Sequence, residues 1–183
     1  SKTGRLDLHE VIDYAKKRNV GIILYVDRRQ LENQLDEILP LFEKAGVKGM
    51  KFGFVQVGTQ EWTAWLHEAI RKAAKHHLVI DIHDRYRPTG YSRTYPNLLT
   101  QEGVRGNEHM PKAEENLTLP FTRMLAGAAD ATVCYFSGRI KTTHAHQLAV
   151  SVVIYSPMQF LYWYNRPEDY KGEPEVEFFD HLP

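Results

Sequence analysis

The chain has 183 residues, a length that suits one domain with a substantial hydrophobic core. Its 23 Lys and Arg residues balance its 23 Asp and Glu residues, so the sequence predicts no nucleic-acid partner, because such binding needs a basic surplus on one face. A single cysteine, Cys134, excludes an internal disulfide, and no apolar run reaches the length of a membrane span.

Hydrophobic spacing predicts alternating helices and strands along the first half of the chain. Apolar residues recur at helical spacing in three segments, and three short, β-branched runs lie between or after them. In chain order, the expected elements are a helix over 6–19, a strand over 21–26, a helix over 30–45, a strand over 47–55, a helix capped by Thr59, and a strand over 78–82.

The second half begins with a polar loop of about 25 residues, which is unusually long for a compact domain and typical of a functional loop. After it the pattern resumes. The expected elements are a short sixth strand near 104–107, a helix over 115–125, a strand over 132–136, a helix over 144–155 and a strand over 159–163.

Strands that alternate with single helices predict parallel βαβ units, and thus an α/β fold. Polar residues follow each expected strand, which favours a (β/α)8 TIM barrel whose active face lies at the strand carboxyl ends. A doubly wound open sheet is the alternative, but it usually carries a glycine-rich phosphate turn that this sequence lacks. Six strands fall short of a barrel, so we expect residues 1–183 to form one partial barrel domain without its first two βα units.

A partial barrel leaves its first and last strands as edges, which are templates for pairing with another chain. We therefore expect self-association or pairing with the remainder of the barrel. The chain opens on Ser1 without a signal-peptide pattern, so the sequence alone leaves its cellular location unknown.

The long loop concentrates the chemistry. Residues 83–97 read H-D-R-Y-R-P-T-G-Y-S-R-T-Y-P-N, and residues 102–108 read E-G-V-R-G-N-E. Carboxylates and guanidiniums at the end of a strand indicate a polar ligand site, although a solvated loop held by ion pairs has a similar composition.

These strings, with K-F-G-F-V at 51–55 and R-M-L-A-G-A-A-D at 123–130, resemble the catalytic region of glycoside hydrolase family 97. The family comprises α-glucosidases and α-galactosidases of gut-type bacteria, which act on oligosaccharides. It has a central (β/α)8 barrel between two β domains, and this chain resembles only barrel strands three to eight. The resemblance implies a periplasmic or secreted protein.

The resemblance also implies roles for individual carboxylates. Glu108 matches the general acid of the family, whereas a loop carboxylate paired with Arg105 is the structural alternative. The family binds calcium through several carboxylates, which match Asp84, Glu102 and Glu108, and hard oxygen ligands suit that ion. A further family ligand comes from the N-terminal domain, so weak Ca2+ binding is expected for this chain.

Retaining members of the family carry an aspartate nucleophile at the position of Gly53, and glycine cannot attack an anomeric carbon. Inverting members have glycine there and activate water with carboxylates that match Asp84 and Asp27. The resemblance therefore favours inversion, which needs an acid and a base about 6.5–9.5 Å apart to leave room for the water. Two departures stand against it, because inverting members use Glu where Asp84 stands and the alignment around Asp27 needs a gap.

Other side chains are candidates for binding the sugar. The expected contacts are hydrogen bonds from polar side chains and stacking on an aromatic ring, although loop scaffolding and packing use the same residue types. The candidates are His83, Arg87, Arg93, Lys51 and Trp163. A non-catalytic, degenerate or engineered barrel fragment with a sugar-shaped cleft is the alternative to an active glycosidase.

Overall fold

A computed structural model describes residues 6–133, 138–161 and 166–181. The chain divides into two compact units, the first comprising residues 1–86 and 91–99, the second residues 87–90 and 100–183. Both contain helices, and the strands of the main sheet begin in the first unit, which gives an α/β structure with a parallel sheet.

The first unit confirms the predicted alternation of helices and strands. Its regular elements are α1 (Leu8–Lys16), β1 (Ile23–Asp27), α2 (Arg28–Ala45), β2 (Gly49–Gly53), α3 (Gln60–Lys75) and β3 (Val79–Ile82). The predicted cap of α3 is confirmed, because the Thr59 side chain accepts a hydrogen bond from the backbone N–H of Trp62. The strand expected over 47–55 ends earlier, at Gly53, since Phe54 adopts a left-handed backbone conformation.

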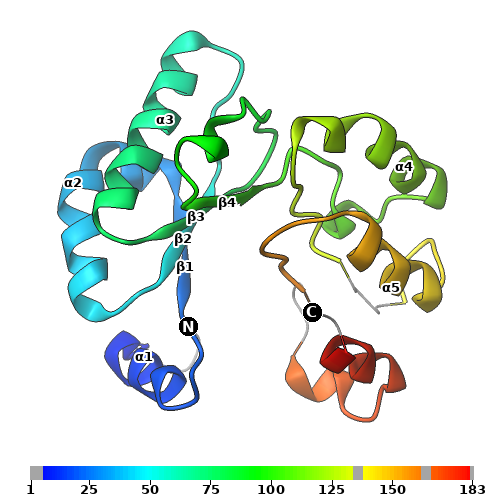
Figure 1. The fold of residues 1–183 in the computed structure, drawn as a ribbon. Coiled ribbons are helices and arrows are strands. Elements are labelled where there is room, and N and C mark those ends of the chain that lie inside the picture. Colours follow the sequence, from blue (N-terminus) through cyan, green and yellow to red (C-terminus); the bar gives the residue numbers. More distant parts are fainter. Residues whose placement is uncertain (1–5, 134–137, 162–165, 182–183) are drawn as a thin grey trace. The chain divides into compact units, whose positions relative to one another are not determined.

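The strands pair in the order β1-β2-β3-β4, and β1–β2 and β2–β3 run parallel. Because side chains alternate along a strand, Met50, Phe52, Ile80 and Ile82 share one face. All four are fully buried, in one cluster with leucines of α2 and α3. Figure 1 shows both helices on the same side of the strands. The apolar face is thus the helix-covered face, and the other face carries Tyr25, Lys51 and Asp81.

The long loop is more structured than the sequence predicted. It contains a 3-10 turn, η1 (Tyr91–Arg93), and a fourth strand, β4 (Leu98–Gln101). The loop also buries Tyr86, of which only 2% is exposed. The prediction of a strand near 104–107 was wrong, because the strand precedes that segment and 107–109 form a 3-10 turn, η2 (Asn107–His109).

Among the described residues, the second unit has two short α-helices and a small apolar core that includes Val150. The helix expected over 115–125 is broken after one turn and a half, since Pro120 cannot continue it. Its elements are α4 (Ala113–Thr118), η3 (Leu119–Phe121), η4 (Arg123–Ala126), α5 (His144–Val153), η5 (Pro167–Tyr170) and η6 (Pro174–His181).

The last two predicted strands are only partly visible. Val133 and Leu161 form an isolated parallel bridge, which agrees with parallel pairing of the segments expected at 132–136 and 159–163. The remaining parts of both segments, with Cys134 and Trp163, lie outside the described residues. A closed or partial barrel therefore stays a prediction.

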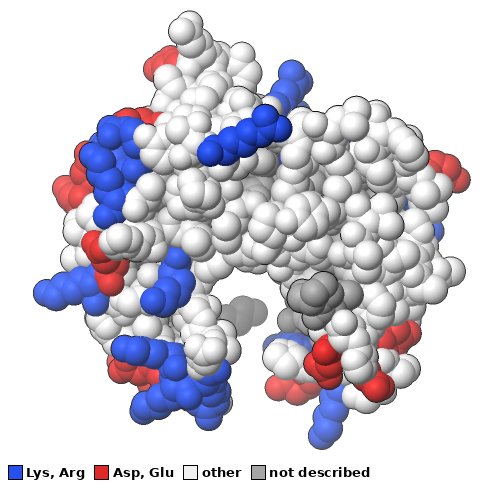
Figure 2. Space-filling view, in the orientation of Figure 1, with Lys and Arg blue, Asp and Glu red and all other residues white. Residues whose placement is uncertain are grey.

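The balanced charge is not evenly spread. Lys and Arg side chains gather where α1 lies (Figure 2). This helix ends at Lys16, and Lys17 and Arg18 follow it directly. Within the described residues, every helix is too short or too polar to cross a membrane.

Candidate active site

The polar face of the first unit ends in three residues at the carboxyl ends of neighbouring strands. Asp27 ends β1, Gly53 ends β2 directly opposite it, and His83 follows β3. One layer below, Tyr25 lies opposite Lys51, which lies opposite Asp81. In parallel α/β proteins the carboxyl ends of the strands form the binding face, so this edge is the candidate site.

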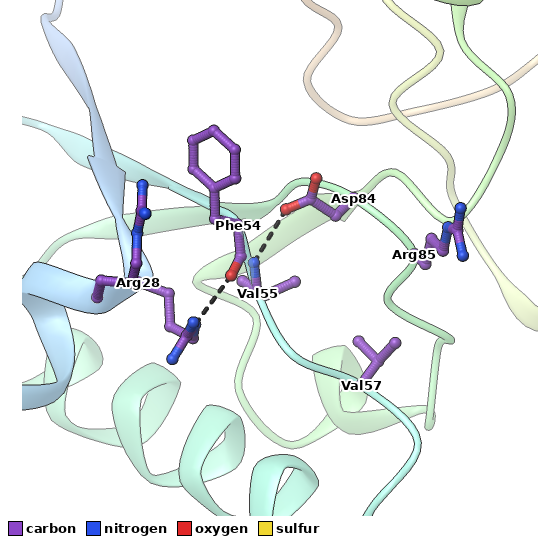
Figure 3. A pocket seen from close by; sticks show the side chains of 7 residues that line it. Arg28, Phe54, Val55, Val57, Asp84 and Arg85 are labelled. Carbon is purple, nitrogen blue, oxygen red and sulfur yellow. Dashed lines mark hydrogen bonds between the residues drawn. The ribbon is translucent and has the colours of Figure 1, made fainter.

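Beside these strand ends lies a hollow with both charged and apolar walls (Figure 3). It belongs entirely to the first unit. The residues that line it are Arg28, Arg29, Phe54, Val55, Val57, Asp84 and Arg85.

The peptide group between Phe54 and Val55 is held from both sides (Figure 3). Arg28 Nε donates a hydrogen bond to the Phe54 carbonyl at 2.9 Å, and Val55 N–H donates to Asp84 Oδ2, also at 2.9 Å. These contacts hold Phe54 at φ +54° and Asp84 at φ +68°. A phenylalanine with positive φ is strained by about 1–3 kcal/mol, and such strain clusters at functional sites.

Asp27 is engaged twice. Its side chain caps α2 by accepting the Arg29 N–H at 2.9 Å, and it pairs with the Arg29 guanidinium at 2.5 Å. The hydrogen bond from Arg29 lowers the pKa of Asp27 below its ordinary value. Asp27 therefore stays ionised at neutral pH but is a weaker proton acceptor than an ordinary aspartate.

Lys51, a candidate for sugar binding, is buried and paired with a carboxylate. Lys51 and Asp81 are 2% and 0% exposed, and Lys51 Nζ is 2.8 Å from Asp81 Oδ2. Burying an unpaired carboxylate costs free energy of folding. The ion pair therefore explains how two charged side chains can be buried within the first unit. This arrangement predicts a structural function for the Lys51–Asp81 pair.

The second unit brings two predicted carboxylates together. Ligand atoms of Glu102 and Glu108 lie within 4.8 Å of one another. Gly106 lies between them in sequence. A Cβ on this residue would be 2.9 Å from the Ala131 carbonyl oxygen and 3.5 Å from Glu102 Oε1, so the close approach of its backbone to Ala131 requires glycine. His109 Nε2 lies 3.3 Å from Glu108 Oε1. Arg105, which the structural alternative paired with Glu108, forms an ion pair with Glu115.

Arg123 fixes the backbone at Glu102. Its Nη2 donates to the carbonyls of Gln101, Glu102 and Ala128 at 3.1, 3.0 and 2.9 Å. Burial lowers the pKa of Arg123 to about 10, so the guanidinium is still charged at neutral pH. The segment 123–130 thus contributes an arginine that holds the backbone of Glu102 in place.

Two further candidates for sugar binding lie on the surface. Arg87 and Arg93 are both exposed, and they belong to different units. Sequence reasoning did not select Tyr25, Arg28 or Phe54. Tyr25 could have been found from its spacing, because residues two apart in a strand share a face and Tyr25 precedes Asp27 by two.

Polar side chains at the carboxyl ends of parallel strands are typical of the binding face of α/β proteins. Comparison with known proteins makes this specific, because the sequence model described as Glycoside hydrolase 97 matches residues 1–104. The chain belongs to glycoside hydrolase family 97.

Two proteins with alpha-galactosidase names are similar to nearly the whole chain. The chain is 34% identical over 194 residues to the retaining alpha-galactosidase of Bacteroides thetaiotaomicron, covering 95% of this chain and 29% of the relative. It is 34% identical over 181 residues to a probable retaining alpha-galactosidase of Streptomyces bingchenggensis, covering 95% and 28%. The chain therefore spans less than a third of the relatives that it matches.

The solved structure of a family 97 enzyme from Pseudoalteromonas sp. strain K8 in complex with acarbose superposes with a TM-score of 0.84 at 30% identity. The match covers 97% of this chain and 32% of that enzyme. A beta-arabinopyranosidase structure has the same fold, with a TM-score of 0.79 at 21% identity.

The structural function of Lys51 is testable by urea unfolding. Lys51→Met leaves Asp81 buried without its cation and should lower the free energy of unfolding by about 3–5 kcal/mol, and adding Asp81→Leu should recover most of that loss. The matched control is Lys72→Met, which breaks the exposed pair with Asp36 and should cost about 1 kcal/mol or less. Equal losses in Lys51→Met and Lys72→Met would contradict this interpretation.

Proposed function

We propose that the protein containing this chain is a glycoside hydrolase that cleaves terminal α-glycosidic bonds of oligosaccharides. Its catalytic domain would be a (β/α)8 barrel to which this chain contributes the segment from strand three onwards. The observation that carries the proposal is the row of strand-end residues, Asp27, His83 and Asp84, in a chain of family 97. A glycosidase of this type is expected in the periplasm or outside the cell.

The proposed reaction uses two carboxyl groups. Glu108, as general acid, gives its proton to the glycosidic oxygen while the bond from that oxygen to the anomeric carbon breaks. A water molecule attacks the anomeric carbon and loses a proton to the general base. Asp84 is the better candidate for the base, because Arg29 and the first turn of α2 already hold the Asp27 carboxylate and lower its pKa.

We propose inversion of the anomeric configuration, although the two relatives described above are named a retaining and a probable retaining alpha-galactosidase. Retention through residue 53 needs a carboxylate there, and this chain has Gly53. The space that such a side chain would enter is filled, because a Cβ built on Gly53 would overlap the Tyr25 hydroxyl and lie 2.7 Å from Tyr25 Cε1.

Calcium fits the donor chemistry of the second unit. The Glu102 and Glu108 carboxylates approach each other closely, as two like charges do when a cation lies between them, and hard oxygen atoms are what Ca2+ prefers. The family resemblance adds Asp84 to the ligand set. The ion, when bound, would supply a fixed positive charge for substrate oxygens.

The deciding experiment is an assay of aryl α-galactosides and α-glucosides with the anomer of the released sugar followed by proton NMR. The proposal predicts release of the β-anomer first. Initial release of the α-anomer would show retention by another nucleophile. Absence of turnover, by the chain alone and in the whole protein, would favour the alternative of a non-catalytic barrel segment.

Glu108→Gln tests the general acid. The variant should lose turnover about 10²–10⁴-fold on substrates with poor leaving groups, which need protonation, and much less on activated aryl glycosides. Glu114→Gln is the control, because Glu114 is an exposed glutamate in α4. Small and equal losses on both substrate classes would remove Glu108 from this role.

Calcium binding is measured by calorimetry on the chain. With so few charged ligands we expect a dissociation constant of about 10⁻⁴–10⁻³ M. Glu102→Gln should abolish the signal, whereas Glu114→Gln should not change it. Submicromolar binding, or binding that survives Glu102→Gln, would overturn the assignment.

A further inference from the structure

Tyr25 lies at the candidate site of the first unit, and none of the roles proposed above explains its position. It lies in β1 on the polar face, two residues before Asp27, and its ring reaches across to the end of β2. Side chains in strands lean along the strand direction, which carries the phenol from the layer of Lys51 up to the layer of Gly53. The hydroxyl group therefore lies at the strand carboxyl ends.

The ring also faces His83. The two ring centroids are 5.9 Å apart with an interplanar angle of 76°, an edge-to-face contact. Tyr25 thus spans the ends of three strands, from its own β1, over Gly53 of β2, to the residue that follows β3. Yet 46% of its surface is exposed. Tyr25 is not a member of the buried apolar cluster on the helix-covered face, so its phenol belongs to the polar face of the strands.

Tyr25 and a side chain at position 53 exclude each other. A Cβ on Gly53 would overlap the phenol hydroxyl, so even alanine there requires the ring to move. Where a carboxylate of residue 53 would project, this chain offers a neutral hydroxyl that both donates and accepts hydrogen bonds. Such a group is a poor nucleophile at neutral pH and a suitable partner for a water molecule.

We propose that Tyr25 is a further catalytic residue, whose hydroxyl group binds the water that attacks the anomeric carbon. This inference rests on the proposed function. The water oxygen forms the new bond to the anomeric carbon and its proton passes to the base, Asp84. The leaving oxygen takes the Glu108 proton, and Tyr25 keeps its own proton throughout, acting through its hydrogen bond.

Tyr25→Phe removes only the hydroxyl and keeps the ring over Lys51 and Gly53. We expect kcat on an α-galactoside or α-glucoside to fall about 10–100-fold, with KM changed less than threefold, because the water rather than the sugar loses its partner. The thermal unfolding midpoint should not change. Tyr14→Phe is the matched control, an exposed tyrosine on α1, and should retain full activity.

Gly53→Ala gives an independent test from the other side of the contact. Its methyl group should displace the phenol and reproduce the kcat loss of Tyr25→Phe. In a Tyr25→Ala background the phenol that this methyl group would overlap is absent, so Gly53→Ala should add no further loss of kcat. Two separate, additive losses would overturn the proposal.

The outcomes separate the two proposals. If the unmodified protein is inactive on both substrate types, the proposed function and this inference fail together. If it is active and Tyr25→Phe has the same kcat, the inference alone fails. If Tyr25→Phe lowers kcat only together with the unfolding midpoint, Tyr25 serves to cover the Lys51–Asp81 pair and the inference is again wrong.

Discussion

The parallel register of β1, β2 and β3 is the constraint on which the candidate site depends. It places Tyr25, Lys51 and Asp81 in one layer and Asp27 opposite Gly53 in the next, while the alternate residues face α2 and α3. A slip of one residue would turn the charged side chains into the apolar core and the apolar ones out of it. Burial of the apolar face, worth about 25 cal/mol per Å² of surface, therefore also fixes the position of the polar groups.

The loops after the strands add a second level of positioning. Arg28 directly follows β1, and Asp84 lies shortly after β3. Both form a hydrogen bond to the peptide group between Phe54 and Val55, which follows β2. This arrangement fixes Phe54 in a strained conformation and orients one oxygen of Asp84 toward the Val55 N–H. Three strand ends are thus connected by side chains, which gives the rigidity that the proposed proton transfer needs.

The first unit was predictable because its strands and helices carry clear periodic patterns, such as the buried Leu31, Leu35 and Leu39 of α2. The structure of the long loop after β3 was less predictable. β4 is only four residues, L-L-T-Q, without the alternation that marks a strand, and its formation depends on pairing within the fold. Glu102 and Glu108 were named from a resemblance, but that Arg123 fixes one of them through backbone carbonyls is a tertiary contact that no local pattern reveals.

The central claim is that the carboxyl ends of β1, β2 and β3 bind a sugar. Acarbose, which a solved relative binds, is a suitable probe for amide chemical shifts of the chain by NMR. The account predicts saturable shifts at Asp27, Gly53 and Asp84, and none at Gly21 or Lys48, which lie at the opposite ends of the strands. Shifts confined to Gly21 and Lys48, or no saturable shift with millimolar acarbose, would contradict it.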